Sequence, residues 1–455
     1  MTNPFGVRPV INASATLTVL GGSVMPPAVV KAMADAAAHF VDLPELHDRV
    51  GERLAALTRN EAACVTSGAA AAITLTVASC VGEPAQAFPA DAEVVMFAGQ
   101  RNGYDYSARL TGARIVEIGP SIAELREALV RRPACVLWFA GEHLAAGALP
   151  IEDVVRLAHE VGHSPGDANS PGGAVRALGR AGEAAGGLGG IVGASGGAGA
   201  GNGGSSGAPG GAAGGLGGGS GGRGDGAGRN GGGSGGCGDG AARSGGGAGV
   251  AGVPVVVDAA AQIPPVSSLW RFTTEVGADA VIFSGGKGLR GPQASGLVLG
   301  KRWIVDRCRA HASPSQEIGR GMKVGKEELL ALLAAVEWTL EQDEDAMLAG
   351  YERMVDRWIA GLQGLPGVVV ERGYPSEAGQ PHSRAIVRLS TTCRWTRDGL
   401  VAALWDRDPR IAVGTFRLTD DAIALNPQTL EPGEDAVVLD ALVSLLSSGN
   451  GEQAG

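Results

Sequence analysis

Short apolar runs of four or five residues alternate with helical patterns along most of this 455-residue chain. Strands that alternate with helices are typical of a mostly parallel sheet covered on both faces. After about residue 309 a long helix leads to three short strands and a last helix, which indicates a second, smaller unit. We therefore predict an α/β fold with a large domain at 1–310 and a smaller C-terminal α/β domain at 311–455. The expected strands are 63–66, 94–97, 114–118, 135–139, 255–257, 280–283, 296–299, 367–371, 385–389 and 411–414, and the expected helices include 27–40, 45–58, 69–81, 326–340 and 434–446.

A block of Gly, Ala and Ser interrupts the large domain at 165–249 and holds most of the chain's excess glycine. Such a segment has too little apolar surface to offset its chain entropy, so we expect a flexible insert without a fixed fold. It lies between a helical pattern that begins at Ile151 and the strand at 255–257. Without this insert roughly 370 residues remain, which is the length on which the fold is judged.

Charge and cysteine content exclude several classes of protein. The formal net charge of −10 argues against a dedicated nucleic-acid surface, although local Arg and Lys residues can still bind a small anionic substrate. The six cysteines are scattered without a C-x-x-C pair, so neither a disulfide framework nor a zinc ribbon is expected. Neither a secretory signal in 1–14 nor an apolar run of membrane-spanning length is found, and we predict a cytoplasmic protein.

Three features at predicted strand ends carry the chemistry. The first is Thr66-Ser67-Gly68-Ala69, directly before an apolar helix. A helix N-terminus offers free N–H groups and a positive dipole end, so this turn suits a phosphate, and Ser67 adds a hydroxyl. An ordinary helix cap is the alternative.

The second and third features are an acid and a lysine that follow buried strands. Asp258 ends "VPVVVD", where a carboxylate can hold a pyridinium nitrogen protonated; a helix-capping Asp is the alternative. Lys287 lies in "FSGGKGLRG", where a desolvated lysine can form a Schiff base; a surface Gly-Lys turn is the alternative. Ser284, three residues before Lys287, can donate to the same phosphate.

Together these features resemble the selenocysteine-synthase-like enzymes that use pyridoxal 5'-phosphate (PLP) on the aspartate-aminotransferase fold, fold type I. The resemblance is nearest to the D-glucosaminate-6-phosphate ammonia-lyase type. It covers nearly the whole chain outside the insert, and "VVVDAAAQ" with "SGGKGLRGPQASG" is highly specific. The other matching stretches are "RPVINASATLTVLGGSVMPPAV", "VTSGAAAAI", "QRNGYDYSARLTGA" and "IGRGMKVGKEEL".

The resemblance implies roles for the cofactor site. Lys287 would carry PLP as a Schiff base and then shuttle protons, Asp258 would pair with the pyridine nitrogen, and Gln262 would touch the ring's 3-oxygen. The expected phosphate ligands are Ser67, Gly68, Ala69 and Ser284.

The resemblance also implies a substrate site. Arg320 and Lys323 would bind a substrate carboxylate or phosphate, with a solvated helix start as the alternative, and Arg101 and Tyr104 would lie near the cofactor. Relatives often have His where this chain has Gln100, so the contact with the ring is expected to differ here. The family usually builds its site from two subunits, which predicts at least a homodimer.

The expected reaction is a deaminating α,β-elimination of a 2-amino-3-hydroxy acid, with a phosphorylated amino sugar acid as one candidate, to a 2-keto acid and ammonia. The alternatives are selenium transfer onto a seryl-tRNA, an aminotransferase or racemase on the same scaffold, and a non-catalytic scaffold that displays the insert. Selenium transfer is disfavoured by the acidic chain and by the start of the family segment near residue 8, which leaves no separate N-terminal tRNA-binding region.

A rival motif, His159-Glu160-x-x-His163, matches the zinc-protease pattern. Gly162 and Pro165 are expected to end its helix there, and Asn169, at the place of a third ligand, binds zinc poorly. We interpret this stretch as the end of a surface helix and predict no metal site.

Overall fold

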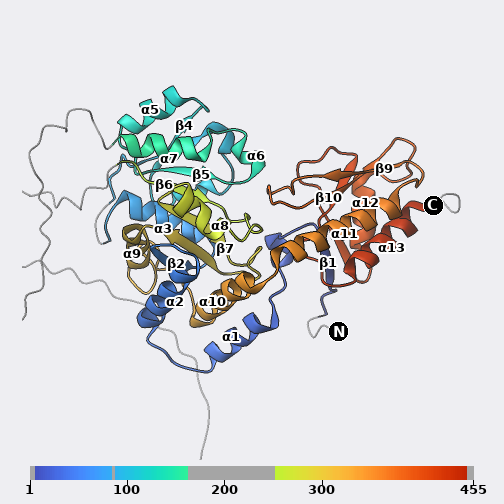
Figure 1. Cartoon of the computed structure of the whole chain (residues 1–455), viewed down its shortest axis with the longest axis horizontal. Helices are drawn as coiled ribbons and strands as arrows, with labels where there is room; N and C mark the ends of the chain where they lie inside the picture. The colour runs from blue at the N-terminus through green and yellow to red at the C-terminus, as the bar shows by residue number, and fades with distance from the viewer. Residues whose placement is uncertain (1–5, 85–87, 162–251, 448–455) are drawn as a thin grey trace, which may run out of the picture. The chain divides into compact units, whose positions relative to one another are not determined.

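The main sheet has seven strands in the computed structural model, which describes residues 6–84, 88–161 and 252–447 (Figure 1). Six strands run parallel, and β8 is antiparallel to both of its neighbours. The predicted α/β fold with a mostly parallel sheet is confirmed. In sheet order the strands are β2 (Ala62–Thr66), β8 (Gly296–Gly300), β7 (Ala280–Ser284), β6 (Val255–Asp258), β5 (Cys135–Phe139), β3 (Glu93–Phe97) and β4 (Arg114–Ile118).

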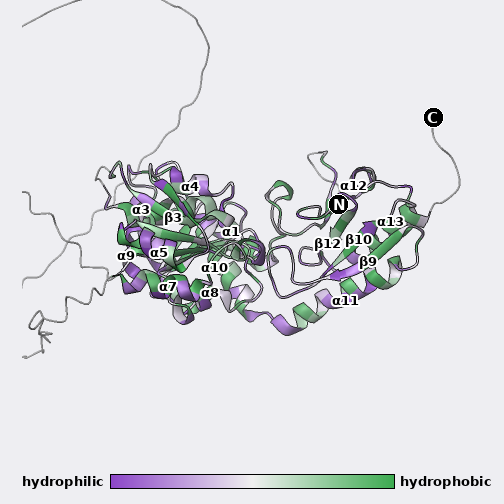
Figure 2. Cartoon of the chain, turned by 90° about the horizontal axis from the view of Figure 1, so that it is seen from above, coloured by the Kyte–Doolittle hydropathy of each residue, from purple (hydrophilic) through white to green (hydrophobic). Residues whose placement is uncertain are grey.

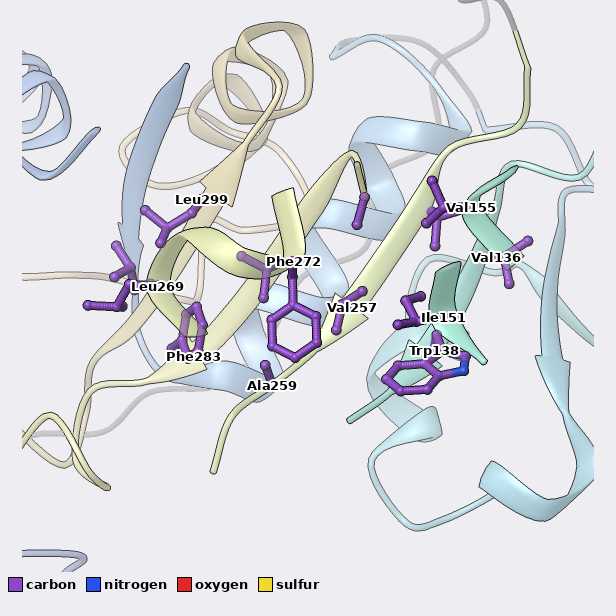
Figure 3. Packing of buried hydrophobic residues seen from close by; sticks show 14 of the residues in the cluster. Val136, Trp138, Ile151, Val155, Val257, Ala259, Leu269, Phe272, Phe283 and Leu299 are labelled. Atoms are coloured by element: carbon purple, nitrogen blue, oxygen red, sulfur yellow. The ribbon is translucent and has the colours of Figure 1, made fainter. Parts of the chain in front are cut away.

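Both faces of this sheet are buried, because side chains alternate along each strand and helices cover each side. Trp138, Val257 and Phe283 point to one face, where they lie in one cluster with Ile151 and Phe272 (Figure 3). The helices of that face are α2 (Leu43–Leu57), α5 (Ile122–Val130), α7 (Ile151–Glu160), α8 (Ser268–Trp270) with η4 (Arg271–Glu275), and α10 (Lys326–Glu341). On the other face lie α3 (Ala69–Val81), α4 (Asp105–Arg109) and α9 (Arg302–His311).

Local signals set where these helices begin. The Asp42 side chain accepts a hydrogen bond from the backbone N–H of Glu45 and caps α2, which also has a proline in its first turn. The apolar α3 spans Ala69–Val81, as the sequence predicts.

The remaining elements of this region are η1 (Thr18–Leu20), α1 (Pro27–Ala37), η2 (Ala98–Gln100) and α6 (Glu142–Ala145).

The C-terminal part has its own hydrophobic core around an antiparallel sheet in the order β12 (Ala422–Leu425), β10 (Arg384–Leu389) and β9 (Val368–Gly373). The helix α11 (Glu344–Leu362), which the sequence patterns did not predict, buries Val355, Trp358 and Leu362. Figure 2 shows that hydrophilic and hydrophobic residues alternate along this helix. The strand β11 (Arg410–Val413) pairs in parallel with the N-terminal β1 (Val10–Ala13). Helices α12 (Arg397–Trp405) and α13 (Glu434–Ser447) complete this part.

The helices and strands of the structure leave two sequence predictions untested. The insert at 165–249 lies outside the described residues, and the domain boundary at 310/311 stays a prediction. All described residues belong to one compact unit of the chain. Among them, the helices are too short or too polar to cross a lipid bilayer.

The rival zinc motif is only partly described, since His163 lies outside the described residues. His159, in the last turn of α7, points its Nε2 at Asp279 Oδ2 at 2.9 Å, and the same oxygen accepts the backbone N–H of Val255 at 2.8 Å. In the described part of the chain, no group of three or more His, Cys, Asp or Glu side chains is arranged to hold a metal ion. His159 therefore fastens α7 to the loop before β7.

This contact predicts a pH-dependent contribution to stability. The hydrogen bond to Asp279 raises the pKa of His159 above its ordinary value. A raised folded-state pKa stabilises the fold fully below the unfolded value of about 6.5 and loses that effect as pH rises through the folded value. We expect His159→Gln to lower the melting temperature more at pH 5.5 than at pH 9, measured by differential scanning fluorimetry. His39→Gln, at an exposed histidine just after α1, serves as the control, and an equal loss at both pH values for His159→Gln would contradict the assignment.

Candidate active site

The register of the sheet brings the predicted chemical groups to one edge. Thr66, at the end of β2, and Ser284, at the end of β7, both pair with Gly296 of the strand between them. Asp258 at the end of β6 pairs with Ile282 of β7. The segments that follow β2 and β7 therefore start roughly 10 Å apart, two strand spacings, and β6 lies one further spacing of roughly 5 Å beyond β7.

The turn from β2 into α3 forms a cradle for an anion. Gly68 has a φ of 115°, in the region that favours glycine, and Ala69 is the first residue of the helix. The first N–H groups of a helix have no partner inside it, and the first turn of α3 carries no acidic side chain. A Cβ at Gly296 would lie 2.5 Å from the backbone of Gly68, so the neighbouring strand passes close to this turn. The half-buried Ser67 precedes it. These features fit a phosphate.

The loop that carries Lys287 is held by backbone contacts. A Cβ at Gly288 would lie 2.0 Å from the carbonyl oxygen of Ile263, so only glycine fits there. The Ser23 hydroxyl, from the N-terminal segment, donates to the carbonyls of Lys287 at 2.7 Å and Gly286 at 3.0 Å. The lysine therefore extends from a fixed loop.

The amine of Lys287 and the carboxyl of Asp258 are both buried charges. Burial lowers the pKa of Lys287, and the attraction of Asp258 opposes this shift. Burial raises the pKa of Asp258, which the hydrogen bond from Ala260 and the charge of Lys287 oppose. The site thus disfavours the charged form of each group, and a ligand that offers both a partner is favoured.

A cavity of about 360 Å³ opens beside these two groups. Five predicted site residues line it: Arg101, Tyr104, Asp258, Gln262 and Lys287. Gln262 Nε2 donates to the carbonyl of Ala378 at 2.7 Å, so a loop of the C-terminal part closes one side.

Other predicted residues do not border this cavity. Ser67, Gly68, Ala69 and Ser284 lie at the same sheet edge but outside the lining, and Arg320 and Lys323 precede α10, also outside it. Lys323 is exposed, and Arg320 donates to the Ser313 hydroxyl at 3.3 Å. Their anion-binding role stays a prediction.

Arg101 reaches the cavity with its charge already paired. Its guanidinium forms ion pairs with Asp105 and Glu117, and the hydrogen bond to Asp105 is the main cause of a raised pKa for Arg101. A substrate anion would compete with two carboxylates here. Arg417, in contrast, lines the same cavity, is exposed, and forms no ion pair with any described residue.

Sequence reasoning missed His143 and Arg417. His143 lies in α6, directly after β5, so the strand-end rule that found Asp258 would also have indicated this segment. Arg417 comes from the C-terminal part and has a φ of 57°. Nothing in the sequence around Arg417 places it beside Lys287.

Gln100, where relatives often have His, is fully buried. Its Nε2 donates to the carbonyl of Phe139 at 3.0 Å, and its Oε1 accepts the N–H of Phe139 at 3.1 Å. Gln100 therefore ties η2 to the end of β5, and both ends of its amide are used by the backbone.

Comparisons with solved structures show which known proteins share this fold. D-glucosaminate-6-phosphate ammonia-lyase has a solved structure with a TM-score of 0.67 and 23% identity, covering 98% of this chain and 99% of that one. A serine palmitoyltransferase with a PLP internal aldimine gives a TM-score of 0.52 at 12% identity, over 96% of this chain and 87% of that one. The chain has the α/β fold of PLP-dependent enzymes.

Sequence comparisons then relate it to particular enzymes. It is 28% identical to a 5'-C-glycyluridine monooxygenase-decarboxylase of a Streptomyces species, over 95% of this chain and 89% of the relative. It is 26% identical to the D-glucosaminate-6-phosphate ammonia lyase of Salmonella typhimurium, over 95% and 94%. An L-seryl-tRNA(Sec) selenium transferase of Desulfomicrobium baculatum matches at 30% over 38% of this chain and 39% of the relative. No protein-family model matches the chain. The chain is thus related to the ammonia lyase and the selenium transferase.

The double contact of Gln100 predicts a structural role. Gln100→Leu would leave the buried N–H and carbonyl of Phe139 without partners, at about 1–3 kcal/mol each. We expect the free energy of unfolding to fall by about 2–4 kcal/mol in urea titrations. Gln342→Leu, at an exposed glutamine whose amide bonds the Trp338 carbonyl, is the matched control. Equal stability of Gln100→Leu and wild type would refute this role.

Proposed function

We propose that the chain binds PLP through Lys287 and uses it for a deaminating α,β-elimination. The observation that carries the proposal is the buried Lys287 amine, whose pKa burial lowers, next to the buried Asp258 carboxyl at the ends of two parallel strands. Asp258 would hold the pyridine nitrogen, and Ser67, Gly68, Ala69 and Ser284 would hold the phosphate. When bound, PLP supplies an electron sink for the pair left by a departing α-proton.

The residues of this chain would handle the protons. Lys287, once the substrate amine has replaced it, removes the α-proton, because a lowered pKa increases the share of the neutral amine, which is the base. The same ammonium can then give its proton to the β-hydroxyl, which leaves as water. Water returns when the released enamine tautomerises and hydrolyses. A 2-amino-3-hydroxy acid thus becomes a 2-keto acid and ammonia without any oxidant.

The substrate would be recognised by its carboxylate. Arg417 is the candidate, because it lines the cavity from the C-terminal part and forms no ion pair with any described residue. The relation to D-glucosaminate-6-phosphate ammonia lyase, 26% identical over 95% of this chain, supports a phosphorylated amino sugar acid as one candidate. Arg320 and Lys323 would bind its second anionic group from a partner copy in a homodimer.

A second candidate is favoured by the relation to the 5'-C-glycyluridine monooxygenase-decarboxylase, which is 28% identical over 95% of this chain. On that alternative the substrate loses its carboxylate as CO₂, and the reaction consumes O₂. Selenium transfer, with a match over 38% of the chain, and an aminotransferase or racemase remain further alternatives. Four observations distinguish these alternatives. Elimination gives ammonia and a keto acid, and the monooxygenase-decarboxylase reaction gives CO₂ with O₂ uptake. Selenium transfer predicts retention on tRNA, and an aminotransferase or racemase gives amino-acid products. A non-catalytic scaffold would bind no PLP.

The protein would work in the reducing cytoplasm. The five cysteines that the structure describes are all free thiols. This state fits a compartment in which disulfides do not persist.

The cofactor assignment predicts a covalent adduct. Wild-type protein incubated with PLP should show a near-visible Schiff-base band that collapses on borohydride treatment, with the pyridoxyl mass on Lys287 in peptide mapping. Lys287→Arg should show neither signal, whereas Lys301→Arg, at a lysine paired with Glu61, should behave as wild type. A colourless wild-type protein that takes up no PLP would contradict the assignment as a PLP enzyme.

The substrate assignment predicts a selective effect on KM. Arg417→Gln should raise the KM for a 2-amino-3-hydroxy acid by about 10- to 100-fold, the loss of one charge-assisted hydrogen bond, in an ammonia-release assay. Arg353→Gln, at an exposed arginine of α11, should leave KM unchanged. An unchanged KM in Arg417→Gln would place the carboxylate elsewhere.

A further inference from the structure

Two large aromatic side chains stand exposed at the rim of the cavity that Lys287 lines. Tyr104 is 58% exposed and Phe416 is 60% exposed, and both belong to the lining of this cavity of about 360 Å³. Phe139 and Asp258, which line the same cavity, are buried and form its floor. Aromatic side chains that remain exposed at the mouth of a cavity are typical of a ligand site, because a ligand can cover them.

The segment that carries each ring is held by other contacts. The backbone N–H of Tyr104 donates to Oδ1 of Asn102 at 2.7 Å. From the C-terminal part, Phe416 packs edge-on against the imidazole of His143 with centroids 6.0 Å apart, and the guanidinium of Arg417 lies 5.7 Å from the Phe416 ring. Among the described residues, the rings of Tyr104 and Phe416 do not stack on each other, so both can meet a ligand.

The polar side chains of the cavity offer little to a ligand rich in hydroxyls or phosphates. Asn102 uses both ends of its amide on the backbone, since its Nδ2 donates to the carbonyl of Gln100 at 2.9 Å. Gln262 donates to a loop of the C-terminal part, and Arg101 is held by two carboxylates. Arg417 can accept one carboxylate, and most of the other lining residues are apolar. The lining therefore favours a substrate with one anionic group and an apolar side chain.

We propose that Tyr104 and Phe416 are specificity-determining residues, which hold a flat aromatic or heteroaromatic ring of the substrate while Arg417 holds its carboxylate. This inference rests on the proposed function, elimination with PLP on Lys287, and it names the substrate class: a 2-amino-3-hydroxy acid with a ring on its β-carbon. Phe416 and Arg417 are consecutive residues, so a ligand that binds both has its ring close to its carboxylate, as such an amino acid does. Offset or edge-on contacts between rings add to the affinity gained from buried area.

The first test measures binding without elimination, in full-length protein loaded with PLP. Phenylalanine and alanine have no β-hydroxyl to lose, and each changes the PLP absorption when its amine replaces Lys287. We expect phenylalanine to bind about tenfold more tightly than alanine. Phe416→Ala and Tyr104→Ala should each weaken phenylalanine binding by about threefold to tenfold and leave alanine binding unchanged, because alanine has no ring to contact them.

The second test measures turnover. Phenylserine, a 2-amino-3-hydroxy acid with a phenyl ring on its β-carbon, should give ammonia and phenylpyruvate with a kcat/KM about tenfold above that of serine. Phe416→Tyr keeps a ring and should retain this preference, whereas Phe416→Leu keeps only apolar bulk and should lose most of it.

Controls separate the ring site from its premise. Tyr106→Ala is the matched control, because Tyr106 is an exposed tyrosine of α4 outside the cavity lining, and it should bind both amino acids as wild type does. Equal affinity of wild type for phenylalanine and alanine, or tighter binding of the hydroxyl-rich D-glucosaminate than of phenylalanine, would overturn the ring site alone. A wild type that forms the Lys287 adduct but responds to none of these amino acids would contradict the proposed function, and this inference with it. If circular dichroism finds Phe416→Ala unfolded, Phe416→Leu and Tyr104→Ala decide.

Discussion

The burial of two opposite charges at the carboxyl edge of the sheet is the constraint on which this site depends. Lys287 and Asp258 each lose hydration, and their attraction only opposes the effect of burial on their pKa values. Such an arrangement costs stability unless a ligand provides partners, which is common at functional sites. The rest of the site holds these two groups in place.

The register of the main sheet determines how far apart the lysine loop and the anion cradle lie. The antiparallel strand β8 passes between the ends of β2 and β7, and its first residue, Gly296, approaches the backbone of Gly68 closely. A side chain at position 296 would push the helix start away from the lysine loop. Glycines at 288 and 296 are therefore required by packing, and the lysine and the anion cradle keep a fixed separation.

The C-terminal part supplies what the sheet edge lacks. The carbonyl of Ala378 receives Gln262, Gln380 donates to the carbonyl of Ile263 at 2.7 Å, and Arg417 contacts His143. These contacts join segments more than 110 residues apart in the chain. They turn an open strand edge into a cavity with a cation at its rim, and a shift of the C-terminal part would alter both affinity and specificity.

The sequence by itself determined the fold class, all seven strands of the main sheet, and the residues at the strand ends, because hydrophobic period and the residue after a buried strand are local signals. Asp258 and Lys287 were found in this way, Gln262 was implied by the family resemblance, and all three line one cavity. Other features depended on the tertiary structure, since they come from contacts between distant segments: the buried double hydrogen bond of Gln100 and the set of residues that share the cavity with Arg417. The residues that a side chain contacts across the fold follow no regular spacing in the sequence, so only the tertiary structure determines them.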